Sequence, residues 1–142
     1  MTIGSLLDDR NNEVVTIEST ASVGEAVRIL AERRIGAMPV VRAGELVGLF
    51  SERDIIYGLK DHGAALLDWT IDKVMTAPPV TVDRAQSLLG ALGLMTRRRV
   101  RHLPVIEGGR LIGFVSIGDL VKHRIDRIER EAEALRDYIT QA

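Results

Sequence analysis

The chain of 142 residues contains no cysteine, few aromatic residues and no long apolar run. The absence of cysteine excludes disulfides, thiol catalysis and cysteine-ligated metals. Aromatic residues make up 4% of the chain, too few for the stacking platform that binds single-stranded nucleic acids. The chain lacks both a membrane-spanning run of about 18 apolar residues and the basic and apolar regions of a signal peptide. We therefore expect a soluble, cytoplasmic protein.

The charge of the chain is balanced overall but unevenly distributed. The formal net charge is −1, with 46% hydrophobic and 27% charged residues, as in ordinary globular proteins. Acidic residues prevail in the first half and basic residues in the second, where Arg97, Arg98, Arg99 and Arg101 form a cationic cluster. Such a cluster indicates a nucleic acid, a phosphate ligand or a solvated helix end. The near-zero net charge makes a long polyanion the least favoured of the three.

Catalytic chemistry finds little support in the sequence. The three histidines, His62, His102 and His123, lack metal-ligand spacing, so we expect no metal site. Ser51 and Ser116 lack the glycine-flanked elbow of hydrolase nucleophiles. We therefore expect a protein that is not an enzyme. For His102, a ligand-facing role and an ordinary surface role both remain open.

An internal repeat with a constant offset of 65 residues, as between Pro39 and Pro104, is the main feature of the chain. Three segments of the first copy return in the second: Val15-Thr16-Ile17 as Val80-Thr81-Val82, Met38-Pro39-Val40-Val41 as Leu103-Pro104-Val105-Ile106, and Gly48, Ser51 and Asp54 as Gly113, Ser116 and Asp119. Because polar residues recur at fixed offsets, the repeat predicts two equivalent pockets related by a pseudo-two-fold axis.

Each copy is predicted to form a strand, a helix, two strands and a second helix, which makes the chain an α/β (α+β) protein. Ser22 and Glu25 predict a capping box at a helix start. Gly44 and the pair Gly108-Gly109 predict tight hairpin turns. Gly90 and Gly93 interrupt a helix and indicate close approach of another backbone, within the pair or between subunits. Since each half is small, we expect the two to share one core.

The predicted organisation is one module over residues 1–142. It divides into a first motif (13–62), a connector (63–79), a second motif (80–122) and a C-terminal helical extension (123–142). Apolar residues of this extension alternate at spacings of four and three, which is typical of a helix–helix seam. Two interpretations stand: the helix folds back on its own domain, or it contacts a second copy.

The repeated Ser-x-x-Asp at a strand-to-helix junction also has two interpretations. The serine and the aspartate are typical of helix capping. The same junction offers free amides to a phosphate, and an acidic side chain there can accept hydrogen bonds from ribose hydroxyls.

With these motifs, the chain resembles a tandem pair of cystathionine-β-synthase (CBS) domains, also called a Bateman module, of the small stand-alone bacterial type. The resemblance covers about residues 13–122. It implies two β-α-β-β-α motifs, disc-like homodimers, and regulatory binding of AMP, ADP, ATP, NAD(H) or S-adenosylmethionine between the repeats, with no catalytic cofactor.

Carried over by position, the resemblance implies two clefts. One would use Asp119 on the ribose and Ser116 near the phosphate, with Thr16 and Gly36-Ala37-Met38-Pro39 around the base. The other would use Asp54, Ser51 and Arg53, with Thr81 and Arg101-His102-Leu103-Pro104 around the base. Because Ile117-Gly118 replaces Glu52-Arg53, we expect unequal clefts, with more phosphate charge beside Asp54. Arg101 and His102 can turn to either cleft, and both placements remain open.

The resulting hypothesis is an adenine-nucleotide sensor that signals by a shift in dimer arrangement. The alternative is a ligand-free structural or partner-binding scaffold, and RNA binding is less favoured still. The motif does not choose among adenosyl ligands or identify a downstream protein.

Overall fold

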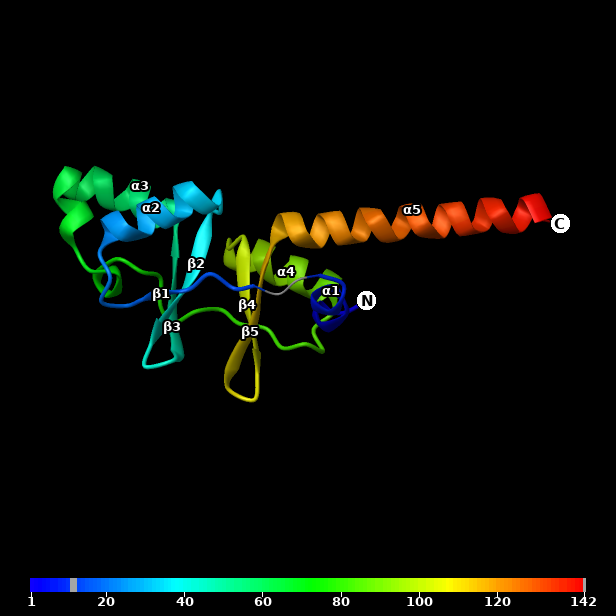
Figure 1. Cartoon of the computed structure of the whole chain (residues 1–142), viewed down its shortest axis with the longest axis horizontal. Coiled ribbons are helices and arrows are strands. Elements are labelled where there is room, and N and C mark those ends of the chain that lie inside the picture. Colours follow the sequence, from blue (N-terminus) through cyan, green and yellow to red (C-terminus); the bar gives the residue numbers. More distant parts are fainter. Residues whose placement is uncertain (11–12, 142) are drawn as a thin grey trace.

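The computed structural model describes residues 1–10 and 13–141 as two sheet-and-helix halves side by side, with a long C-terminal helix projecting from the second (Figure 1). The α-helices are α1 (Ile3–Asp8), α2 (Val23–Arg33), α3 (Glu52–His62), α4 (Leu88–Arg98) and α5 (Ile117–Gln141). The strands are β1 (Ile17–Glu18), β2 (Ala37–Arg42), β3 (Glu45–Ser51), β4 (His102–Glu107) and β5 (Arg110–Ser116). Two 3-10 helices, η1 (Gly63–Asp68) and η2 (Ile71–Lys73), lie in the connector.

The two halves repeat the same strand register. β1 pairs in parallel with β2 through Ile17 and Val40, and β2 pairs antiparallel with β3. In the second half β4 pairs antiparallel with β5. The strand predicted at 80–82 is reduced to one parallel bridge, Val82 to Val105, at the position equivalent to the β1–β2 pairing. The predicted α/β repeat is therefore confirmed, with a shorter first strand in each copy than the sequence indicated.

The hairpin turns follow the glycine pattern. Ala43 and Gly44 both have positive φ, at 50° and 80°, as do Gly108 and Gly109 at 56° and 77°. Two successive positive φ values are the requirement of the tight turn that joins twisted antiparallel strands. The predicted turns are confirmed, including one in which alanine accepts the left-handed conformation.

Serine begins the first helix of each half. Ser22 Oγ accepts a hydrogen bond from Glu25 N at 3.1 Å, and Ser87 Oγ accepts one from Gly90 N at 2.9 Å. The other half of the predicted capping box is absent, because the Glu25 carboxylate pairs with Arg28 on the next turn. An ion pair on the helix surface thus replaces the bond back to the cap.

The interior glycines of α4 do not meet a second backbone within the described chain. A Cβ at Gly90 would clash with the side chains of Gln86 and Ser87, and one at Gly93 would lie 3.0 Å from the Arg97 guanidinium. Gly90 thus leaves room for the residues that begin its own helix. The expectation of a backbone seam is wrong within this chain and stays a prediction for contacts between subunits.

The expectation of one shared core is wrong, because each half has its own cluster of buried residues. The first cluster includes Val23, Met38 and Phe50, and the second includes Leu88 and Leu103. The segment that precedes each repeat completes the cluster of the other repeat. α1 contributes Ile3, Leu6 and Leu7 to the second cluster, while the connector contributes Leu66 and Ile71 to the first.

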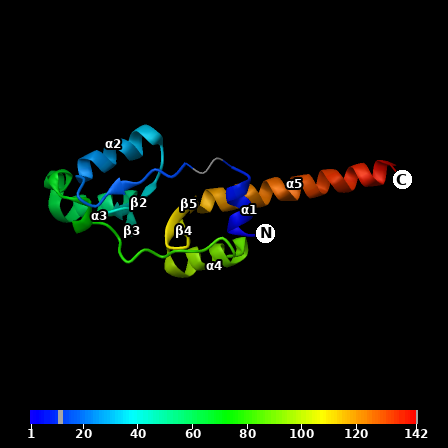
Figure 2. The same cartoon turned by 60° about the horizontal axis from the view of Figure 1, so that its bottom comes forward.

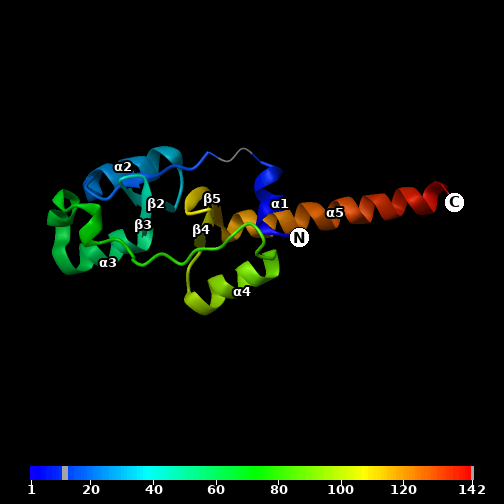
Figure 3. The same cartoon turned by 90° about the horizontal axis from the view of Figure 1, so that it is seen from below.

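This exchange is itself symmetric. A β-bridge joins Thr2 to Ser87, and the equivalent bridge joins Thr70 to Ser22. After α1 packs beside the start of α5, the chain crosses to the first half and enters α2 (Figures 2 and 3). These crossing segments tie each repeat to the buried cluster of the other.

Helix α5 does not fold back on its own domain. It has 25 residues, of which Leu120 is buried, and its distal part extends away from both halves (Figure 1). The predicted extension to residue 142 reaches one position outside the described residues. No helix in the described part of the chain is long and apolar enough to cross a membrane.

Candidate functional site

A cavity of about 340 Å³ lies between the two halves, within the size range of small-molecule sites. Three parts of the chain line it: the segment between α1 and β1, the link from α2 into β2, and the β4–β5 hairpin with the first turn of α5. The lining residues are Arg10, Glu13, Val14, Val15, Arg34, Ile35, Gly36, Ala37, His102, Phe114, Ser116 and Asp119. The cavity therefore exists only when both repeats and the crossing segment are in place.

Ser116 and Asp119 form a reciprocal cap at the start of α5. Ser116 N donates to Asp119 Oδ2 at 2.8 Å, and Asp119 N donates to Ser116 Oγ at 3.1 Å. The capping interpretation is thus correct for this junction. Because both Asp119 interactions with described residues, this one and an ion pair to Arg10, use Oδ2, its Oδ1 accepts no hydrogen bond from them. One carboxylate oxygen remains available at the cavity.

Arg10 reaches into the cavity from the N-terminal segment. Its Nη1 lies 3.0 Å from Asp119 Oδ2, and its Nη2 donates to the Phe114 carbonyl at 2.7 Å. Its buried Nε has no hydrogen-bond partner among the described residues. Burial by itself would raise the pKa of Asp119, but the Ser116 amide and the Arg10 guanidinium outweigh burial and lower it. Asp119 is accordingly a carboxylate at neutral pH.

His102 lines this cavity beside Asp119. The resemblance put it around the base in the Asp54 cleft and left a turn to either cleft open. Its ring stacks on Phe114 with centroids 5.3 Å apart. A Cβ at Gly36 would lie 3.5 Å from His102 Cε1, so the two halves approach closely here. Burial lowers the pKa of His102 below its ordinary value, against the opposing effects of Asp119 and Glu52. The hairpin register places His102 opposite Ser116, which turns it towards this site.

Asp54, the repeat equivalent of Asp119, has a different environment. Its Oδ2 accepts from Ser51 N at 2.8 Å and from Ser51 Oγ at 3.3 Å, and its Oδ1 accepts from Thr76 Oγ1 at 3.1 Å. Both carboxylate oxygens are therefore engaged. Burial raises the pKa of Asp54 despite these hydrogen bonds. The expected inequality of the two sites is visible in this contrast.

Arg53, expected as a phosphate contact in the Asp54 cleft, bonds the backbone at the end of α4. Its Nη1 donates to the Arg99 carbonyl at 3.1 Å, where α4 ends. Arg53 thus ties the start of α3 to the end of α4. Arg101, expected nearby, is exposed to solvent.

The remaining expected residues divide by burial. Gly36 and Ala37 line the cavity. Four others are buried within strands β2 and β4: Met38, Pro39, Leu103 and Pro104. Thr16 and Thr81 are exposed at equivalent positions and do not line the cavity. The structure therefore brings together Gly36, Ala37, Ser116 and Asp119 of the set expected around Asp119. It leaves Thr16, Met38 and Pro39 of that set outside the cavity lining.

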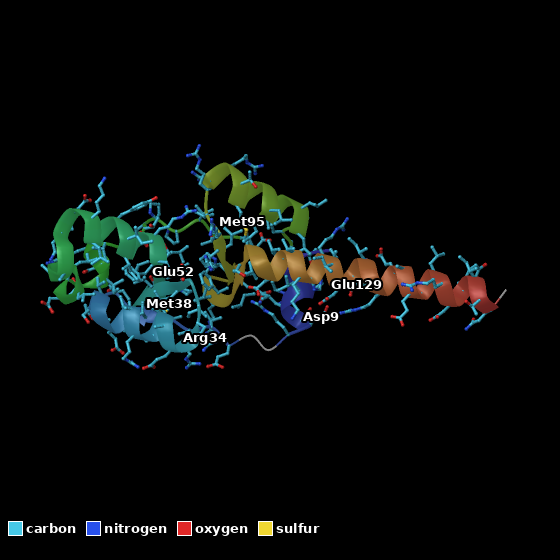
Figure 4. The ribbon with its side chains drawn as sticks, turned by 90° about the horizontal axis from the view of Figure 1, so that it is seen from above. Asp9, Arg34, Met38, Glu52, Met95 and Glu129 are labelled. Atoms are coloured by element: carbon cyan, nitrogen blue, oxygen red, sulfur yellow. The ribbon has the colours of Figure 1, made fainter. Side chains whose placement is uncertain are left out.

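The sequence interpretation missed Arg10, Arg34 and Phe114. Arg34 lies at the end of α2 nearest the second half (Figure 4). Arg34 and Arg99 share the repeat offset and both end a helix with φ of 54°. That repetition was a usable signal for Arg34. The sequence held no such signal for Arg10, because the position of Arg10 depends on where the N-terminal segment passes from the second half to the first.

Comparison with known proteins gives a consistent result. The family model described as CBS domain matches twice, over residues 7–61 and 71–126. A CBS-domain containing protein from Agrobacterium tumefaciens is 39% identical, with a TM-score of 0.83, over 87% of this chain and 92% of that one. A protein with CBS domains from Burkholderia ambifaria is 34% identical, with a TM-score of 0.84, over 89% and 95%.

A curated relative shows the same similarity in sequence. The CBS domain-containing protein CBSX3, mitochondrial, of Arabidopsis thaliana is 34% identical over 123 residues, which are 83% of this chain. The match spans 60% of that relative's own length.

Proposed function

This chain belongs to the CBS-domain family as a tandem pair, and from that premise we propose that it is a regulatory module, not an enzyme, that binds an adenosine ligand. The candidate ligands are AMP, ADP, ATP, NAD(H) and S-adenosylmethionine. The observation that carries the proposal is the cavity between the halves, in which Asp119 keeps one oxygen without a partner among the described residues.

The chemistry of the cavity suits a nucleoside with an anionic group. The free Asp119 oxygen accepts from vicinal ribose hydroxyls, as acidic residues do in dinucleotide sites. Val14, Val15 and Ile35 supply an apolar wall for a flat base. Arg10 and Arg34 supply positive charge for a phosphate, which prefers planar guanidinium donors.

Two solved structures with this fold hold adenosine ligands. One is CBSX2 in complex with AMP, with a TM-score of 0.73 and 24% identity. The other is the CBS domain pair of MJ0100 in complex with 5′-methylthioadenosine and S-adenosyl-L-methionine, with a TM-score of 0.78 and 23% identity. At these identities the likeness is one of fold, and the ligands are those of the two solved proteins. For this chain, the support for an adenosine ligand comes from its own cavity.

We place the ligand in the Asp119 site. Both oxygens of Asp54 already accept hydrogen bonds, so a ribose there shares them with Ser51 and Thr76, whereas Asp119 offers an oxygen with no donor among the described residues. This reverses the expectation from sequence that the Asp54 side holds more phosphate charge. A ligand in the Asp119 site contacts both halves and the crossing segment, and differential affinity for two arrangements of these parts shifts their populations. In a homodimer, this shift would be the signal passed to a downstream protein.

Calorimetry tests the proposal on the full chain. AMP, ATP, NADH and S-adenosylmethionine are titrated into the wild type, Asp119→Asn and Asp54→Asn. We expect binding by the wild type and by Asp54→Asn, with a loss of at least about tenfold in Asp119→Asn, because an amide is a poorer acceptor for two hydroxyls. Circular dichroism checks that each variant is folded. No binding by a folded wild type, or equal binding by both variants, contradicts the proposal.

A ligand-free scaffold is the second candidate, and the exposed apolar side chains of α5 favour it. Ile128, Leu135 and Ile139 are between 50% and 65% exposed. The absence of heat with every nucleotide would leave this function in first place.

A further inference from the structure

Helix α5 carries a continuous apolar stripe that the described part of the chain leaves exposed. Its members recur at spacings of four and three and are all solvent-exposed: Val121, Ile125, Ile128, Ala132, Leu135 and Ile139. At 25 residues the helix is about 37 Å long. A stripe with this spacing stays on one side of a helix and is typical of a coiled-coil seam.

The stripe faces away from the hollow that α5 shares with α1. Residues of α1 and its end share a surface hollow with Lys122, His123, Asp126 and Arg130 of α5. By helical spacing His123, Asp126 and Arg130 lie on the opposite side from the stripe, and Lys122 lies at its flank. The apolar face is therefore about half-covered near the body, at Val121 and Ile125, and more open towards the tip, at Leu135 and Ile139.

The charges beside the stripe identify the partner. With Ile125, Ala132 and Ile139 as a positions, the flanking g positions are Arg124 and Glu131, and the e positions are Glu129 and Arg136. In a parallel pair each g residue faces the e residue five positions later in the other helix. Arg124 then meets Glu129, and Glu131 meets Arg136, so every complete flanking pair is of opposite charge.

The antiparallel alternative is electrostatically poor. If two copies overlap along the full stripe in opposite directions, Glu129 faces Glu129, Glu131 faces Glu131, and Lys122 faces Arg136. Like charges beside a seam destabilise it and set orientation. Among the described residues, Arg124, Glu129 and Arg136 form no ion pair within the chain, so they are available to a partner.

We propose that α5 binds α5 of a second copy of this chain as a parallel, in-register coiled coil. The a positions hold Ile125, Ala132 and Ile139, and the d positions hold Val121, Ile128 and Leu135. These apolar residues do not by themselves set the number of strands. The two flanking pairs of opposite charge are what support pairing with one other helix. The seam spans under three heptads, so the contact is reversible by itself. The proposal does not rest on nucleotide binding, and the test below contains no nucleotide.

The absence of cysteine makes a site-specific test direct. Leu135→Cys places one thiol in the seam, while Asp137→Cys places one on the opposite side of the same turn as a matched control. In a parallel pair the two thiols at 135 meet, whereas in the full antiparallel overlap position 135 lies beside position 125, about 15 Å from its copy. Under diamide, we expect Leu135→Cys to form a covalent dimer at least about tenfold faster than Asp137→Cys.

A charge swap in the Leu135→Cys background separates this seam from other contacts. Glu129→Arg places an arginine opposite Arg124 in both of the 124–129 pairs of the dimer. Each such pair contributes modestly, so we expect cross-linking to slow by about tenfold. Arg124→Glu with Glu129→Arg restores opposite charges and is expected to restore the rate. Sedimentation of the uncross-linked chain gives its oligomeric state.

Three results overturn the proposal. They are equal cross-linking rates at positions 135 and 137, no rescue by the charge swap, and a monomer in sedimentation. A monomer in sedimentation would indicate that the stripe binds a different protein. A dimer whose cross-linking ignores the swap would place the contact on another surface.

Discussion

Arg10, near the start of the chain, forms an ion pair with Asp119 in the first turn of the last helix, with Nη1 3.0 Å from Oδ2. Thr76, in the segment before the second repeat, bonds Asp54 in a comparable way, with Oγ1 3.1 Å from Oδ1. Each repeated aspartate is thus held by the segment that leads into the other repeat. One aspartate keeps an oxygen free at a cavity, and the other is fully engaged.

Removal of Arg10 is expected to raise the pKa of Asp119. The guanidinium stabilises the carboxylate, so in Arg10→Met the effect of burial is less opposed. A carboxyl whose pKa is lower in the folded than in the unfolded state stabilises the fold at pH values above its unfolded pKa. This stabilisation is lost as the pH falls through the folded pKa. The wild type should therefore lose more stability on acidification than Arg10→Met. NMR titration of the Asp119 carboxyl measures this pKa. Arg84→Met, which removes the ion pair with Asp8, is the control. An unchanged Asp119 midpoint in Arg10→Met contradicts the prediction.

The two aspartates should respond in opposite ways to neutralisation. Burial raises the pKa of Asp54, so its ionisation disfavours the folded state as pH rises through that value. Asp54→Asn is expected to raise the melting temperature at pH 7, whereas Asp119→Asn, which loses an ion pair, lowers it. Both groups are partly exposed, so shifts of about 2–3 °C are expected. Thermal melts at pH 7 and pH 3 measure them, and the same sign for both variants would be contrary evidence.

The motif glycines Gly48 and Gly113 provide a matched pair for packing. A Cβ at Gly48 would lie 2.9 Å from the Thr76 carbonyl oxygen, a backbone atom, and 2.7 Å from Met75 Sδ. A Cβ at Gly113 would meet only the flexible side chain of Leu7 within the described chain. We expect Gly48→Ala to lower the free energy of unfolding by about 2–3 kcal/mol and Gly113→Ala by about 1 kcal/mol. Urea unfolding measures the two free energies of unfolding. A larger loss in Gly113→Ala than in Gly48→Ala would contradict the prediction and show that the connector at Met75 and Thr76 moves more easily than Leu7.

Nucleotide binding should change the titration of His102. Burial lowers the pKa of this ring, which Asp119 and Glu52 raise and Arg101 lowers. An anionic phosphate bound in the same cavity favours the charged ring, so AMP is expected to raise the pKa and adenosine to raise it less. The histidine Cε1–H signals follow this by NMR, with His62, which contacts Trp69 and lines neither hollow, in the same spectrum as a reference. Equal shifts with AMP and adenosine would place the phosphate elsewhere.

The repeat, the hairpins and the helix starts were predictable because each depends on residues close together in the chain. Gly109 provides a positive φ in its own turn, and Ser87 accepts a hydrogen bond from an amide three residues later. The family, too, was predictable, since its motif recurs at one offset. The side of the site on which His102 lies was not, because it depends on how the two halves meet.

Residue order alone therefore established two copies of one local unit and their polar junctions, through steric limits on φ and ψ and through short-range hydrogen bonds. Packing of distant segments decided the rest: which half each lead-in segment completes, which aspartate keeps a free oxygen, and that α5 leaves the body. The reason is that Arg10 gains its position from α1, which is buried against α4 and β5, and nothing near Arg10 in the chain encodes that contact.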